Sequence, residues 1–178
     1  MTSLLLSIAL VILPGSHFNN AITDTATGKM TIPVEYSFNS ITIYNDIQVF
    51  ILEGVKNEII VSNEGEASNI KFKVDNDVLI IKSRKNIFSG NNMIKIIIMV
   101  KDIHCITNMG DAEVRTIGEL SDRNLKLEIY GDGAIYVSTK ANEVNTFIRG
   151  LGKIEVKGNF KNTSVNKDAY GNMITKYN

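Results

Sequence analysis

Apolar and polar residues alternate along most of the chain after residue 37. This period of two is typical of β-strands, whose successive side chains point to opposite faces of a sheet. Turn-prone groups such as Asn45-Asp46 and Asp75-Asn76-Asp77 separate the alternating segments. No stretch matches the 3.6-residue period of an amphipathic helix, so an all-β fold is predicted. In the first half, strands are expected at residues 38–43, 47–52, 58–61, 70–74, 78–82 and 94–100.

The second half repeats a glycine-containing segment followed by an alternating strand. Aligned on Gly110, Gly133, Gly152 and Gly171, the repeats are 23, 19 and 19 residues apart. A period near twenty with strand-like alternation indicates stacked repeats. We therefore predict a single-chain parallel β-helix, or β-solenoid, with rungs of about 19–23 residues, preceded by further strands. The four extra residues of the first interval are expected in a loop near residues 118–121.

The repeat also predicts which side chains point inward. One face should carry Ala112, Ile135, Ile154 and Met173 together with Val114, Val137, Val156 and Thr175, and the other face Glu113, Tyr136, Glu155 and Ile174. Lys167 takes an inward position that is apolar in earlier rungs, which predicts an open last rung. At the corners, a positive φ or a lack of space for a Cβ would explain the glycines. The corner glycines are Gly110, Gly131, Gly133, Gly150, Gly152 and Gly171.

The first 21 residues differ from the rest of the chain. Residues 4–13 form an uncharged apolar run, and the first charged side chain is Asp24. Ten residues are too few to span a bilayer but suit the apolar region of a secretory signal peptide. Residues 1–21 are therefore predicted to direct export, the alternative being a buried first strand. Residues 22–35 are polar and rich in threonine, and a flexible lead-in is expected there.

Composition and candidate chemistry exclude several classes of protein. Lysine plus arginine equals aspartate plus glutamate, at 19 each, and no basic stripe predicts a nucleic-acid partner. Cys105 is the only cysteine, so the chain forms no intramolecular disulfide. Its neighbour His104 should point to the opposite face, and no catalytic residue, metal site or cofactor is expected. The glycine alignment places Asp111 and Asp132 in different columns, which disfavours the alternative of a carbohydrate-active enzyme on a parallel β-helix.

Taken in order, several segments resemble the putative auto-transporter adhesin, head GIN domain family. They are Phe38-Asn39-Ser40-Ile41, residues 47–54, the strand at 78–81 and the successive Gly-x-Gly corners, with Asn108 and Ala169 where the family tends to have glycine. The resemblance covers residues 36–178. It implies a non-catalytic, adhesin-like binding or structural module of the bacterial periplasm, outer membrane surface or exterior. The expected partner is a surface glycan or envelope protein, and the expected state is monomeric.

Overall fold

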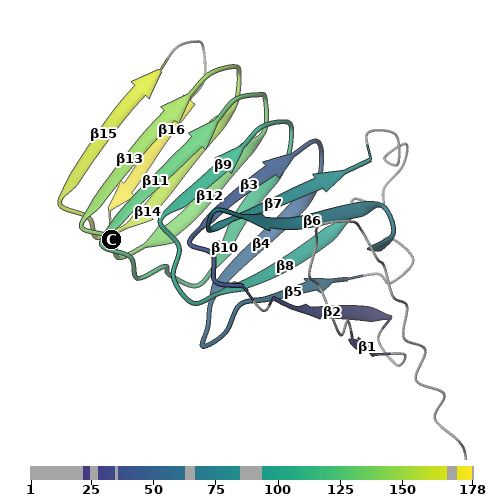
Figure 1. Cartoon of the computed structure of the whole chain (residues 1–178). Helices are drawn as coiled ribbons and strands as arrows, with labels where there is room; N and C mark the ends of the chain where they lie inside the picture. Colours follow the sequence, from purple (N-terminus) through teal and green to yellow (C-terminus); the bar gives the residue numbers. More distant parts are fainter. Residues whose placement is uncertain are drawn as a thin grey trace, which may run out of the picture.

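The computed structural model describes residues 22–24, 28–34, 36–62, 67–84, 94–167 and 172–177. The predicted signal peptide at 1–21, Ala169 and the corner glycine Gly171 lie outside these ranges. The described elements are strands in two sheets whose pairing is mostly parallel (Figure 1). The prediction of an all-β fold is confirmed.

Sheet A is the larger of the two sheets. Within the described ranges its order is β1 (Ile22–Asp24), β2 (Lys29–Pro33), β5 (Glu58–Val61), β8 (Lys95–Val100), β4 (Gln48–Glu53), β10 (Glu113–Ile117), β12 (Ala134–Thr139), β14 (Lys153–Gly158) and β16 (Asn172–Tyr177). Sheet B has the order β15 (Asn162–Lys167), β13 (Glu143–Ile148), β11 (Asn124–Ile129), β9 (Cys105–Asn108), β3 (Ser40–Tyr44), β7 (Val78–Ser83) and β6 (Ile70–Asp75).

From β9 onward the chain alternates between the two sheets. Each strand pairs in parallel with the strand two places later, so β9/β10, β11/β12, β13/β14 and β15/β16 form successive layers (Figure 1). Glu113 pairs with Ala134, Ala134 with Lys153, and Lys153 with Asn172. The layers therefore repeat after 21, 19 and 19 residues.

This register corrects the glycine alignment made from the sequence. Val114 pairs with Ile135, so Gly110 corresponds to Gly131, and Ala112 corresponds to Gly133. The alignment had set Ala112 opposite Ile135, two residues out of register. The extra residues therefore number two and not four, and they lie between β10 and β11, where the loop was predicted.

The predicted inward and outward faces survive this error, because side chains alternate with a period of two and a shift of two residues keeps each on its face. Val137 is 3% exposed, and Tyr136 lies on the outer face. The buried inward positions are Ala112, Val114, Ile135, Val137, Ile154 and Val156, with Met173 partly buried.

The strands of the first half extend the same two sheets. The layer β3/β4 pairs with β9/β10 on one side and with β7/β8 on the other. The antiparallel strands β6 and β5 follow on the outer side of β7 and β8. After β4 the chain therefore leaves the stack, builds β5 to β8, and returns at β9 beside β3. The sequence predicted these strands but not their place in the order.

The predicted flexible lead-in differs from the structure where residues 22–35 are described. β1 pairs with β2, and β2 pairs in antiparallel fashion with β5. Met30, Ile32 and Val34 alternate with more exposed residues and are buried in the core. This apolar alternation outweighs the turn-prone, threonine-rich composition from which flexibility was predicted, because burial of three such side chains stabilises the strand.

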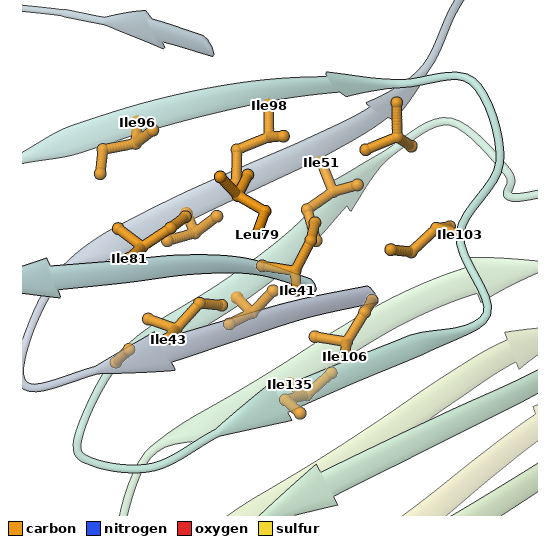
Figure 2. Packing of buried hydrophobic residues seen from close by; sticks show 14 of the residues in the cluster. Ile41, Ile43, Ile51, Leu79, Ile81, Ile96, Ile98, Ile103, Ile106 and Ile135 are labelled. Atoms are coloured by element: carbon orange, nitrogen blue, oxygen red, sulfur yellow. The ribbon is translucent and has the colours of Figure 1, made fainter. Parts of the chain in front are cut away.

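The core lies between the two sheets. Ile41 and Ile43 of β3, Leu79 of β7 and Ile98 of β8 are fully buried, and Figure 2 shows them packed together. Burial of each side chain of this size stabilises the fold by about 1.5–3 kcal/mol relative to leaving it exposed. At the far end of the stack, Val165 of β15 is 48% exposed because no layer follows it within the described residues.

Candidate functional site at the glycine corner

The chain crosses from sheet B to sheet A at a sharp corner in each layer. Asn45, Gly110, Gly131 and Gly150 occupy equivalent positions there, as the flanking registers require. We call them the glycine column. A Cβ on Gly131 would lie 2.6 Å from the carbonyl oxygen of Gly110, and a Cβ on Gly150 would lie 2.4 Å from that of Gly131. At the three glycines of this column the layers thus approach through their backbones, with no space for a Cβ.

Gly133 and Gly152 line the inner side of the same corner. A Cβ on Gly133 would lie 2.4 Å from the carbonyl oxygen of Ala112. The Gly133 amide donates to the Gly110 carbonyl at 3.2 Å, and the Gly152 amide donates to the Gly131 carbonyl at 3.1 Å. Close approach therefore accounts for these glycines, and of the corner glycines that the structure describes only Gly150 has a positive φ, at 124°.

Asn108 has a different role from the one its sequence position suggested. It was aligned with a corner glycine, but the register pairs it with Ile129, inside the core. Its side chain is fully buried and donates to the Ala112 carbonyl at 2.7 Å, while its Oδ1 accepts from the Gly110 amide at 3.2 Å. The side-chain amide therefore closes this corner by hydrogen bonding, as buried polar groups require.

A row of large side chains flanks the glycine column on the sheet B side. Tyr44, Met109 and Tyr130 stand at equivalent positions of three successive layers, since Met109 donates its amide to Ile43 and Tyr130 to Asn108, both at 2.8 Å. We call these three residues the aromatic row. Met109 is 38% exposed and Tyr130 36% exposed.

Neighbouring side chains support the aromatic row. The rings of Tyr130 and Phe147 have centroids 5.2 Å apart at an angle of 43°. Such tilted pairs restrict both rings. The Nζ of Lys82 lies 4.5 Å from the centroid of the Tyr44 ring. The row could not be recognised in the sequence, because its members lie far apart in the chain.

An acidic row flanks the glycine column on the sheet A side. Asp46, Asp111 and Asp132 each directly follow a member of the column and therefore stand at equivalent positions. The prediction that Asp111 and Asp132 fall in different columns is wrong, because it rested on the misaligned glycines. Both are exposed, and the Oδ1 of Asp132 accepts from the Leu151 amide at 3.0 Å. Adjacent members are about 4.8 Å apart along the stack.

The outer face of sheet A carries a network of paired charges. The Tyr136 ring lies between the Arg115 guanidinium, 4.0 Å from its centroid, and the Lys153 ammonium, 5.1 Å away. Arg115 pairs with Glu113 at 2.7 Å, and Lys153 pairs with Glu155 at 2.9 Å. These cations are already engaged by carboxylates, so this face presents a compensated, solvated wall.

Glu155 is the most strongly perturbed carboxyl of that network. Hydrogen bonds from Lys176 of β16 and from Lys153 lower the pKa of Glu155 to about 2. Glu155 is therefore ionised at any physiological pH. Lys176 is thereby held on the outer face of sheet A.

His104 and Cys105 do not form a joint site. The His104 ring contacts the Asp122 carboxylate, whereas the Cys105 thiol lies 3.6 Å from the Thr107 hydroxyl. Burial raises the pKa of the Cys105 thiol, which keeps it protonated and a poor nucleophile. Within the described ranges, no three His, Cys, Asp or Glu side chains are grouped so that they could hold a metal.

A small hollow lies beside Asp122. Its volume is about 40 Å³, and its lining includes Glu53, Asp102 and Ser121. The Ser121 amide donates to Glu53 at 2.7 Å across it. Small-molecule sites are usually several hundred Å³ in volume, so this hollow is too small for a sugar or a cofactor.

Fold and surface together define a class: an all-β module of two mostly parallel sheets with repeated side-chain rows on its walls. The chain belongs to the family described as "Putative auto-transporter adhesin, head GIN domain", which it matches over residues 37–175. This bears out the resemblance found in the sequence. No curated protein is similar enough to be counted as a relative. In the part of the chain that the structure describes, no helix has the length and apolar character needed to cross a membrane.

One of the similar solved structures shows the same fold. A putative adhesin from Parabacteroides distasonis superimposes with a TM-score of 0.61 at 16% identity, covering 82% of this chain and 71% of that one. A putative adhesin from Bacteroides fragilis has a TM-score of 0.49 at 15% identity, with 84% and 97% covered.

Proposed function

We propose that this chain is an exported, non-catalytic module of the bacterial cell envelope that binds a surface glycan or an envelope protein. Membership of the adhesin family supports a binding role. The observation that carries the proposal is the corner of the stack, where the aromatic row, the glycine column and the acidic row repeat from layer to layer. Adhesin-like binding at this corner would require no conformational change of the protein.

The proposal includes a two-sided parallel β-solenoid as the scaffold. Its support is the unbroken parallel register from β4 through β10, β12, β14 and β16. In such a stack, each layer is held by its two neighbours. Side chains on the wall then keep fixed spacings, which favours recognition of an extended partner by a monomeric protein.

The corrected register adds one observation in favour of the alternative, a carbohydrate-active enzyme. Asp111 and Asp132 are one layer apart, about 4.8 Å, close to the separation of the two carboxyls in retaining glycosidases. In that mechanism one carboxyl must keep its proton, which requires surroundings poor in water. Both aspartates are exposed on a ridge, so we favour the non-catalytic role. Release of reducing ends from envelope polysaccharides, abolished in Asp111→Asn, would reverse this choice.

Export is tested by the mass of the protein in its native host. We expect cleavage before about residue 22, because the apolar run at residues 4–13 has the length of a signal-peptide core. Intact-mass spectrometry of cell fractions should find the shortened chain outside the cytoplasm. A full-length cytoplasmic product that retains Met1 would contradict export.

Binding is tested with beads that carry the purified mature protein. Beads should be retained on surfaces coated with bacterial envelope glycans or envelope proteins, and they should not be retained on albumin-coated surfaces. A heat-denatured preparation on the same beads is the control for non-specific adsorption. Equal retention of native and denatured protein would contradict the proposed binding role.

A further inference from the structure

The three rows at the corner run along the stack axis, across the strands. Tyr44 and Tyr130 belong to the same row and lie two layers apart, with Met109 between them. Because each layer adds about 4.8 Å, the two tyrosines are separated by roughly 10 Å along this axis. That distance is comparable to one disaccharide unit of an extended β-linked hexopyranose chain.

The chemistry of the rows suits such a chain. Aromatic rings pack against the apolar C–H faces of pyranose rings, and carboxylates accept hydrogen bonds from sugar hydroxyls. Between Tyr130 and Asp132 lies Gly131, which has no side chain to hold a ligand away from the backbone. In the layers of Gly110 and Gly131 the corner thus offers an apolar contact and a hydrogen-bond acceptor with no side chain between them, whereas Asn45 separates Tyr44 from Asp46.

We propose that this corner binds a neutral, extended β-linked hexopyranose chain that lies along the stack axis. Tyr44 and Tyr130 contact sugar rings one disaccharide apart, and Asp111 and Asp132 accept hydrogen bonds from the hydroxyls between them. The three carboxylates of the acidic row oppose an anionic polysaccharide on the sheet A side of the corner, while Lys82 and Arg149 stand at the two ends of the aromatic row. The inference rests on the proposed binding function and names the ligand class of that surface.

A peptide is a poorer occupant of the same surface. An added peptide strand needs free backbone donors and acceptors at a sheet edge. At this corner the amides of Gly133 and Gly152 already donate to the preceding layer, at 3.2 and 3.1 Å. A ligand with a regular repeat also matches a surface whose side chains recur once per layer.

The test uses two neutral probes, the β-1,4-linked hexasaccharides of glucose and of N-acetylglucosamine. Titration calorimetry with the mature protein should show binding of at least one of them. Tyr44→Ala and Tyr130→Ala should each weaken that binding about tenfold, since aromatic anchors dominate such contacts. Tyr136→Ala is the matched control: it removes a tyrosine from the same layer as Tyr130, but on the outer face of sheet A, and should leave affinity unchanged.

Tyr130→Phe keeps the aromatic ring and should bind within about twofold of the native protein, which separates ring contact from misfolding. A hexamer of galacturonic acid should bind more weakly than the neutral probes. Absence of binding to both neutral probes overturns the inference, as does undiminished binding by Tyr130→Ala. Tighter binding of oligolysine than of either sugar would assign the corner to a cationic peptide instead. If Tyr44→Ala/Tyr130→Ala beads still bind envelope-coated surfaces, the binding function stands and this site assignment fails.

Discussion

Gly131 lies directly against Gly110 of the preceding layer, so closely that a Cβ on Gly131 would be 2.6 Å from the Gly110 carbonyl oxygen. The contact occurs in the register that pairs Val114 with Ile135. This register brings Asp111 and Asp132 into one row, and it places Tyr130 beside Met109. The surface we propose for binding therefore depends on this register at the corner.

Gly131→Ala should destabilise the fold by about 1–3 kcal/mol, because the added methyl group must displace backbone and not a flexible side chain. Urea unfolding followed by circular dichroism measures the change. Gly118→Asn is the control: Gly118 has open space around it and a φ of 76°, which asparagine tolerates. If Gly131→Ala loses no more stability than Gly118→Asn, the backbone at the corner can shift to make space for the methyl group.

Val137→Asp should cost about 3 kcal/mol or more, since it places an unpaired carboxylate between the sheets at a site only 3% exposed. Tyr136→Asp, at the neighbouring position, should cost about 1 kcal/mol or less. The new carboxylate would face solvent beside Arg115 and Lys153, where its charge is partly compensated. Thermal melting of both variants tests the register of β12. Equal losses of stability would contradict the assignment of these two faces.

Glu155 should titrate near pH 2 in the folded protein. Its pKa lies below the value of about 4.3 expected for an unfolded chain. Its ion pairs therefore stabilise the fold fully above that unfolded value, and the contribution is lost as the pH falls from about 4 towards 2. Carboxyl chemical shifts followed by NMR give the midpoint. Lys176→Met should clearly raise this midpoint. The control, Lys157→Met, removes a lysine that is not hydrogen-bonded to Glu155 and should change the midpoint less.

The last layer leaves the edges of β15 and β16 unpaired within the described residues. Lysines on edge strands oppose edge-to-edge association. Replacing Lys167 and Lys176 together by Val should therefore cause concentration-dependent association, detected by light scattering. Lys157→Val, on the interior strand β14, is the control and should leave the protein monomeric. A double variant that stays monomeric at high concentration would show that these lysines do not protect the edge.

The alternation of single residues was enough to predict the strands and their faces. Val137 and Val156 could be assigned to the interior and Tyr136 and Glu155 to the exterior, because a strand repeats every two residues whatever it pairs with. The repeat of about twenty residues could also be recognised in the sequence. For the same reason the sequence alone could not detect an error of two residues, since such a shift leaves every side chain on its face.

Tertiary structure alone decided which residues share a row. Alternation permits several registers, and in the one observed Gly131 lies against Gly110, an approach that leaves no space for a Cβ, and Asp111 lies beside Asp132. Tertiary structure also decided that β3 lies between β7 and β9, because the pairing of Ser40 with both Val78 and Cys105 joins segments far apart in the chain. Local pattern carries no information about such pairings, which depend on the shape of the whole core.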